Sequence, residues 1–104
     1  MTKHLPIGVD RAVRAYCEDY PRRREAIEKG VLPSETLAHY TILNAKIDRA
    51  IASCCDEGFC EEMREDIGSG TGHRATRLNY LGINTYKTYK QATKLAIARA
   101  LHLL

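Results

Sequence analysis

The sequence predicts an all-α fold, with an N-terminal helical hairpin followed by a C-terminal helix-turn-helix that has a long last helix. Apolar residues recur at three-to-four spacing along most of the chain, and strict alternation of apolar and polar residues is nearly absent. The 104 residues are enough for one core. We therefore expect a single domain over residues 1–104, in which a hairpin and a short acidic helix (1–67) precede a basic unit (68–104).

Two amphipathic segments make up the expected hairpin. The first runs from about Ile7 to Lys29, and Pro21 predicts either a kink or a break within its apolar stripe. The second starts near Pro33 and ends before Gly58, again with apolar residues at three-to-four spacing. The short connection between them favours an antiparallel pair that buries both stripes.

A short acidic helix is expected next, over residues 59–67, with its carboxylates, including Asp66, turned outward. Three glycines should break this helix and form a flexible connector: Gly68, Gly70 and Gly72. Their G-x-G-x-G spacing after a helix differs from the phosphate loops of nucleotide-binding proteins, which follow a strand. We therefore expect no nucleotide site here.

The C-terminal third contains the parts of a helix-turn-helix. The stretch HRATRLNYLG predicts a short helix that ends at Gly82. The last helix should begin near Asn84 or Thr85, either of which can cap it, and run to the chain end. Its front is polar and its rear, LAIARALHLL, is apolar, so the rear is expected to anchor the helix on the body.

Charge is unevenly distributed along the chain. Residues 1–66 carry 10 Lys and Arg against all 13 Asp and Glu, whereas residues 67–104 carry 6 basic residues and no acidic one. A long segment of one sign predicts a polyanionic partner, with nucleic acid favoured over an anionic membrane surface. A solvated basic face with no partner is the alternative.

The chain shows no signal peptide and no run of the ~20 apolar residues needed to span a bilayer, so we expect a cytoplasmic protein without a membrane partner. Reduced thiols are expected in that compartment. The cysteines lack the closely spaced pairs of structural zinc sites, and small, partly buried thiols are the favoured interpretation. These are Cys17, Cys54, Cys55 and Cys60.

Enzymatic chemistry is not predicted. The clustered carboxylates of residues 56–66 belong to about three turns of one helix, whereas acid–base or two-metal chemistry draws them from different elements into a pocket. The histidines are scattered, and none is placed in a recognised nucleophile motif. We expect no catalytic residue, metal or cofactor.

The stretch GINTYKT, from Gly82 to Thr88, resembles the start of the recognition helix in sigma-factor region 4 and in LuxR-type helix-turn-helix proteins, where GIS leads into NTVKT. The wider layout is similar to small phage-encoded transcription regulators of the ArpU and RinA kind, in the stretches YPRRREAI, LNAKIDRAI and YKTYKQATKLAIARALHLL. The resemblance implies a helical N-terminal part followed by a sigma-like DNA-binding unit.

The favoured hypothesis is a DNA-binding transcription regulator of phage or prophage type that reads double-stranded DNA with its last helix. Base contacts are expected from Asn84, Thr85, Lys87, Thr88 and Gln91. Phosphate contacts are expected from Arg74, Arg77, Lys90 and Lys94. A homodimer or RNA polymerase would add affinity. The alternatives are an α-helical protein-interaction or assembly module and a membrane-surface amphipathic C-terminus.

Overall fold

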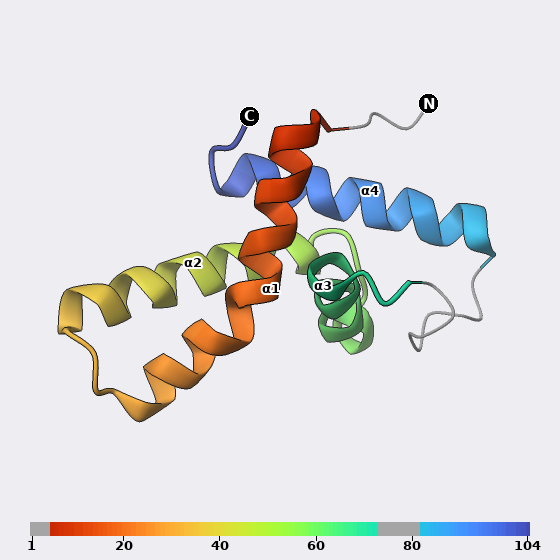
Figure 1. Ribbon diagram of the computed structural model, residues 1–104. Coiled ribbons are helices and arrows are strands. Elements are labelled where there is room, and N and C mark those ends of the chain that lie inside the picture. The colour runs from red at the N-terminus through yellow and green to blue at the C-terminus, as the bar shows by residue number, and fades with distance from the viewer. Residues whose placement is uncertain (1–4, 73–81) are drawn as a thin grey trace.

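The computed structural model describes residues 5–72 and 82–104, and this part of the chain is helical with no strand (Figure 1). The predicted all-α class is confirmed. The short helix expected over residues 73–81 lies outside the described residues. The helices are α1 (Ile7–Lys29), α2 (Ser34–Ala52), α3 (Cys60–Ser69) and α4 (Ile83–Ala100), with a 3₁₀ turn η1 (Glu57–Phe59) before α3.

α1 is one uninterrupted helix that contains Pro21. Proline has no N–H, so the carbonyl four residues earlier, that of Cys17, loses its helical donor at this point. The ribbon changes direction along α1 (Figure 1), which agrees with a kink and not with a break. The helix ends at Gly30, which takes up the left-handed conformation (φ 64°) and donates its N–H to the carbonyl of Ala26.

α1 and α2 are joined by residues 30–33 and are held together by a buried polar contact. The Arg23 side chain is buried, its Nε donates to Oδ1 of Asn44 at 2.7 Å, and its Nη2 donates to the carbonyl of Tyr16 at 2.6 Å. Asn44 in turn donates to the carbonyl of Tyr20 at 3.4 Å. The buried side chains of Arg23 and Asn44 therefore both have partners, as burial requires.

Tyr20 links three helices. Its hydroxyl donates to Oδ2 of Asp48 on α2 at 3.0 Å, and the guanidinium of Arg64 on α3 lies 4.0 Å from the centre of its ring. A cation over an aromatic face is favourable by about 0.5–2 kcal/mol, depending on how far it is desolvated. The tyrosine thus fixes α2 and α3 on either side of α1.

α3 packs closely against α1 at Gly68. A Cβ at this position would lie 2.8 Å from the backbone nitrogen of Glu18 and 2.9 Å from the carbonyl carbon of Cys17. The expected break at Gly68 is wrong, because α3 continues through it to Ser69 and ends at Gly70 (φ 70°). The expected boundary between residues 67 and 68 therefore falls inside a helix, where glycine provides close packing and not flexibility.

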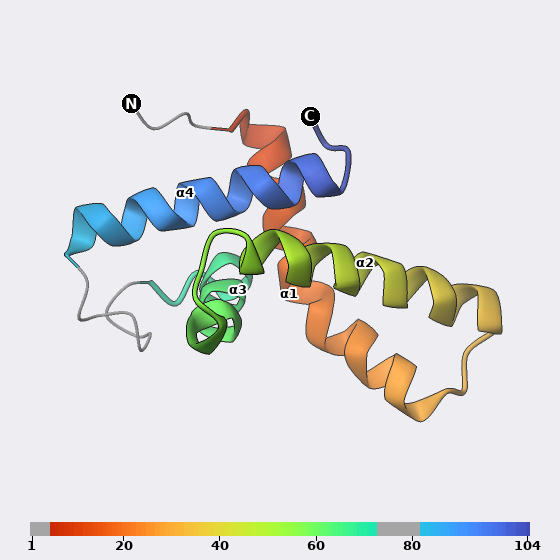
Figure 2. The same cartoon turned by 180° about the vertical axis from the view of Figure 1, so that it is seen from behind.

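One hydrophobic core joins all four helices. Its fully buried members include Val13 of α1, Ile47 of α2, Met63 of α3 and Tyr86 and Ile97 of α4. Viewed from either side, α4 runs across the N-terminal half of α1 and lies next to the end of α2 (Figures 1 and 2). The basic C-terminal helix is therefore part of the same packed body as α1, α2 and α3.

Replacing Gly68 with alanine is expected to destabilise the fold by about 1–3 kcal/mol, because backbone atoms of α1 cannot move aside as a flexible side chain would. Chemical denaturation measures the change. Gly8→Ala is the matched control, since Gly8 is also helical and a Cβ there meets nothing within 4 Å. An equal or smaller loss in Gly68→Ala than in the control would contradict the close packing.

Candidate nucleic-acid interface

α4 begins at Ile83 with Gly82 in the capping position, and no side chain caps it. The expectation that Asn84 or Thr85 caps this helix is wrong, because both residues lie within its first turn. The helix ends at Ala100 and does not reach the chain end. The amide of Asn84 and the hydroxyl of Thr85 are consequently not engaged as caps, and both residues are exposed.

Two faces of α4 have different environments. Tyr86, Thr93 and Ile97 are seven and four residues apart, which places them on one side of the helix, and they are buried against the other helices. Four polar residues of the first two turns are exposed, and we call them the polar front of α4: Asn84, Thr85, Lys87 and Thr88. The hydroxyl of Thr88 donates to the carbonyl of Asn84 at 2.9 Å and keeps its acceptor capacity.

Asp66 holds the front half of α4 in place. Its carboxylate is fully buried, and Oδ2 accepts the hydroxyl of Tyr86 and pairs with Nζ of Lys90 at 3.1 Å. Oδ1 accepts the N–H of Gly72 at 2.5 Å and the hydroxyl of Thr71 at 3.5 Å. The expectation that Asp66 faces outward is therefore wrong, because four donors from outside α3 converge on it.

The environment of Asp66 keeps it ionised. Burial by itself would raise the pKa of the carboxyl, but the hydrogen bonds from Tyr86, from the N–H of Gly72 and from Lys90 together outweigh burial and lower the pKa below its usual value. At neutral pH the side chain is a buried anion whose charge is matched by Lys90 and by oriented dipoles. Such a carboxylate holds its partners in one arrangement, because loss of a partner would leave a buried charge uncompensated and would lower the stability of the fold.

Lys90 and Lys94 point into the body of the protein. Lys90 pairs with Asp66, and Lys94 pairs with Oδ1 of Asp10 at 2.9 Å. Only 23% of the Lys90 side chain and 11% of the Lys94 side chain are exposed. These ion pairs argue against the phosphate contacts expected for the two lysines and give them a structural role. Arg74 and Arg77 lie outside the described residues.

Gln91 occupies an intermediate position between the buried and exposed faces. It lines a cleft between the start of α1 and α4, together with Arg11 and Arg14. Its side-chain oxygen is buried and has no hydrogen-bond partner among the described residues. An unsatisfied buried acceptor costs about 1–3 kcal/mol, which is typical of a position kept for something other than stability.

Sequence reasoning missed Asp66, the residue that positions α4. One clue was present: Asp66 lies in the last turn of α3, where the negative end of the helix dipole disfavours an acidic side chain. A carboxylate in that position needs donors from elsewhere. The chain does not reveal that they come from a residue 20 positions later, Tyr86, and from the N–H of Gly72.

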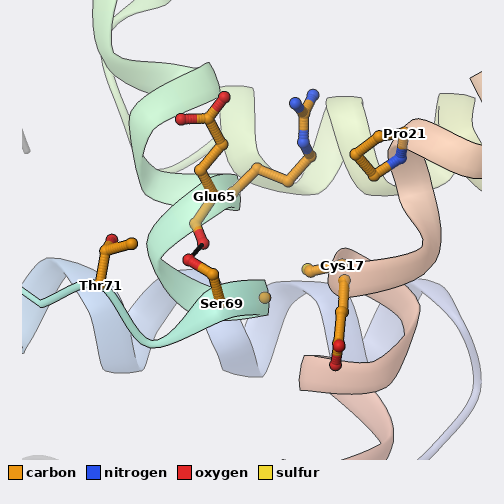
Figure 3. Close-up of a pocket in the computed structure, with 8 residues that line it drawn as sticks. Cys17, Pro21, Glu65, Ser69 and Thr71 are labelled. Atoms are coloured by element: carbon orange, nitrogen blue, oxygen red, sulfur yellow. Dashed lines mark hydrogen bonds between the residues drawn. The ribbon is translucent and has the colours of Figure 1, made fainter.

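A second cleft, of about 290 Å³, lies between α1 and α3, where Cys17 faces Ser69 and Thr71 (Figure 3). The Cys17 thiol is a poor nucleophile, because burial raises its pKa to about 11 and the thiol is therefore protonated at neutral pH. The hydroxyl of Ser69 is occupied with the carbonyl of Glu65 at 2.6 Å. This arrangement fits packing between two helices, and all four cysteines are free thiols.

Within residues 5–72 and 82–104, no group of three or more His, Cys, Asp or Glu side chains is arranged to hold a metal ion. In the same ranges, no helix has the length and apolar content needed to cross a membrane. Comparisons of the chain with protein-family models, with curated proteins and with solved structures find no match. The chemistry of the described surface therefore carries the functional argument.

Asp66→Asn is expected to lower the free energy of unfolding at pH 7 by about 3–5 kcal/mol, since it leaves Lys90 without its counter-charge. Because the folded-state pKa is lowered, the carboxylate stabilises the fold above the usual aspartate pKa of about 3.9, and this contribution disappears as pH falls through the folded pKa. The difference between parent and variant should shrink below about pH 4. Urea denaturation at several pH values measures it.

The exposed neighbour Glu65, on the same helix, provides the control for Asp66. Glu65→Gln should change stability by less than about 0.5 kcal/mol at every pH. A loss in Asp66→Asn that is no greater than in this control, or that does not depend on pH, would show that Asp66 is not a buried, ionised anchor.

Proposed function

We propose that the protein binds double-stranded DNA as a transcription regulator of phage or prophage type, with the start of α4 in the major groove. One observation carries the proposal. The first two turns of α4 expose the polar front, while the opposite side of the same turns is held on the body by the contact between Tyr86 and Asp66. Residues 83–104 contain no acidic residue that would repel a phosphate.

The side chains of the polar front have the chemistry that groove contacts require. The amide of Asn84 matches the donor and acceptor pair on the edge of adenine, and Thr85 and Thr88 offer hydroxyls to bases or phosphates. Lys87 supplies a positive charge, and it has no carboxylate partner among the described residues. A helix fits the major groove, which is about 12 Å wide. The resemblance of GINTYKT to recognition helices points to the same use of this helix.

A single unit of this size offers few contacts, because specific protein–DNA interfaces bury about 1,000 Å² or more of protein surface. We therefore include a second copy of the chain in the proposal, with RNA polymerase as the other candidate partner. The outer part of the α1–α2 arm lies far from α4 in both views (Figures 1 and 2). Apolar residues of the α1–α2 connection and of the first half of α2 are exposed. Val31 is 80% exposed and Ile42 is 53% exposed. This apolar arm tip is the proposed contact between copies.

The same apolar arm tip favours a second function. An α-helical assembly module would use exposed Val31, Leu32 and Ile42 to bind a partner protein and would need no DNA contact. In that case the polar front of α4 would be a solvated surface. DNA binding and its salt dependence distinguish the two functions, because only contacts with phosphate release counterions.

Lys87→Ala is expected to weaken binding to duplex DNA and to lower the slope of log K against log salt by about one, the contribution of one phosphate contact. Fluorescence anisotropy with labelled duplex at several salt concentrations measures the slope. Lys29→Ala is the matched control, because Lys29 is an exposed lysine at the far end of α1 that pairs with Glu25 at 2.8 Å. Binding that is insensitive to salt, or an equal effect of the two variants, would overturn the proposal.

The double variant Val31→Ser and Ile42→Ser is expected to weaken self-association at least about tenfold, since two exposed apolar contacts of about 1 kcal/mol or more would be lost. Analytical ultracentrifugation over a range of protein concentrations measures this. Leu104→Ser removes an apolar side chain that is 60% exposed outside the arm and should have no effect. Unchanged self-association in the double variant would exclude the apolar arm tip as the contact.

A further inference from the structure

A cleft of about 290 Å³ separates the beginning of α1 from α4. α1 contributes two arginines to its lining, and α4 contributes Gln91 and Lys94. Figures 1 and 2 show that the N-terminal half of α1 crosses α4 at this place. Residues about 80 positions apart in the sequence therefore form one surface, and we call it the α1–α4 cleft. Its lining residues are Leu5, Ile7, Asp10, Arg11, Arg14, Gln91 and Lys94.

The arginines of the α1–α4 cleft differ from those elsewhere on α1. Arg22 is paired with Asp19 at 2.6 Å, and Arg24 is paired with Glu61 at 3.5 Å. Arg11 and Arg14 are exposed, and neither has a carboxylate partner among the described residues. The positive charge of the cleft is consequently available to an outside ligand.

The carboxylate that lines this cleft, that of Asp10, is already neutralised. Asp10 pairs with Lys94 at 2.9 Å, so this lysine cancels the acid and leaves the arginines as the net charge. Asp66 is saturated by its four donors. A Cβ at Gly70 would lie 3.6 Å from Nη2 of Arg14, so the Arg14 guanidinium lies at the end of α3. Arg14 also lines the cleft with residues of α4, and it is not one of the four donors to Asp66.

The α1–α4 cleft continues the polar front of α4. Lys87, Gln91 and Lys94 are three to four residues apart, so they follow one another along one side of the helix. Gln91 and Lys94 line the cleft, and Lys87 lies one turn before it. At 1.5 Å per residue, Asn84 and Gln91 are about 10 Å apart along the axis, which is close to the width of the major groove.

We propose that Arg11 and Arg14 bind the DNA phosphate backbone at the edge of the groove that α4 enters, with the amide of Gln91 as a further donor. The proposal rests on the proposed function and adds a second element, the start of α1, to the binding surface. Arginine is suited to this task because its planar guanidinium matches the geometry of a phosphate. Gln91 lines the same cleft as the two arginines, so its side-chain N–H groups lie on the proposed phosphate-binding surface.

The test is the salt dependence of duplex DNA binding by the double variant Arg11→Gln and Arg14→Gln. Losing two phosphate contacts should reduce the slope of log K against log salt by about 1.8, so the affinity gap to the parent should be about tenfold larger at 50 mM than at 200 mM salt. The double variant Arg11→Lys and Arg14→Lys keeps both charges and should retain the slope. Arg22→Gln with Arg24→Gln is the matched control, since these arginines are exposed on the same helix but paired.

Thermal unfolding of each variant shows whether the fold is intact. A reduced slope in Arg11→Gln with Arg14→Gln alone supports the proposal. If that variant and the Arg22 and Arg24 control bind alike, while Lys87→Ala still reduces the slope, the α1–α4 cleft does not bind phosphate although the chain binds DNA. If the parent shows no salt-dependent binding to duplex DNA, both the inference and the proposed function fail.

Discussion

The buried carboxylate of Asp66 is the constraint on which the arrangement of α4 depends. Removing an ionised carboxylate from water costs several kcal/mol, and the fold tolerates this because hydrogen bonds and one lysine replace the lost hydration. The donors come from the residues just after α3 and from two successive turns of α4, Tyr86 and Lys90. The chain therefore has to bring α4 back across α3 in one orientation, which then decides which side chains of α4 face outward.

That orientation gives the lysines of α4 two different roles. Lys90 and Lys94 neutralise buried or partly buried acids, so they stabilise the fold. Lys87 stays outside, next to hydroxyl and amide side chains. The surface of α4 therefore carries less positive charge than its sequence indicates, because two of its lysines are paired with acids. Arg11 and Arg14 of α1 add positive charge beside it. In our account a polyanion would meet a surface made from both ends of the chain.

The sequence predicts most of the local structure and little of what depends on contacts between distant residues. Apolar spacing gives the helical class, the bounds of α1 and the start of α2, because that pattern is a property of each segment. The expected end of the second helix just before Gly58 is wrong, because α2 ends at Ala52. The sequence does not show that Asp66 is buried or that Gly68 packs against α1, since a carboxylate on a short acidic helix is usually solvated and a glycine among glycines is usually a connector. Their roles depend on α4 and on the kinked backbone of α1. Likewise, a count of charges along the sequence does not show which lysines form ion pairs inside the protein. It also does not show that Arg11 lies next to Gln91 and Lys94, because only folding brings these residues together.

In the proposed complex the polar front of α4 and the start of α1 form one DNA-binding surface. Titration of ¹⁵N-labelled protein with duplex DNA, followed by the backbone amide chemical shifts in NMR spectra, tests it most directly. Chemical-shift changes are expected at Asn84 to Thr88 and at Arg11 to Arg14, and they should fade as salt is added. Shifts confined to the arm, or no shifts at all, would contradict it.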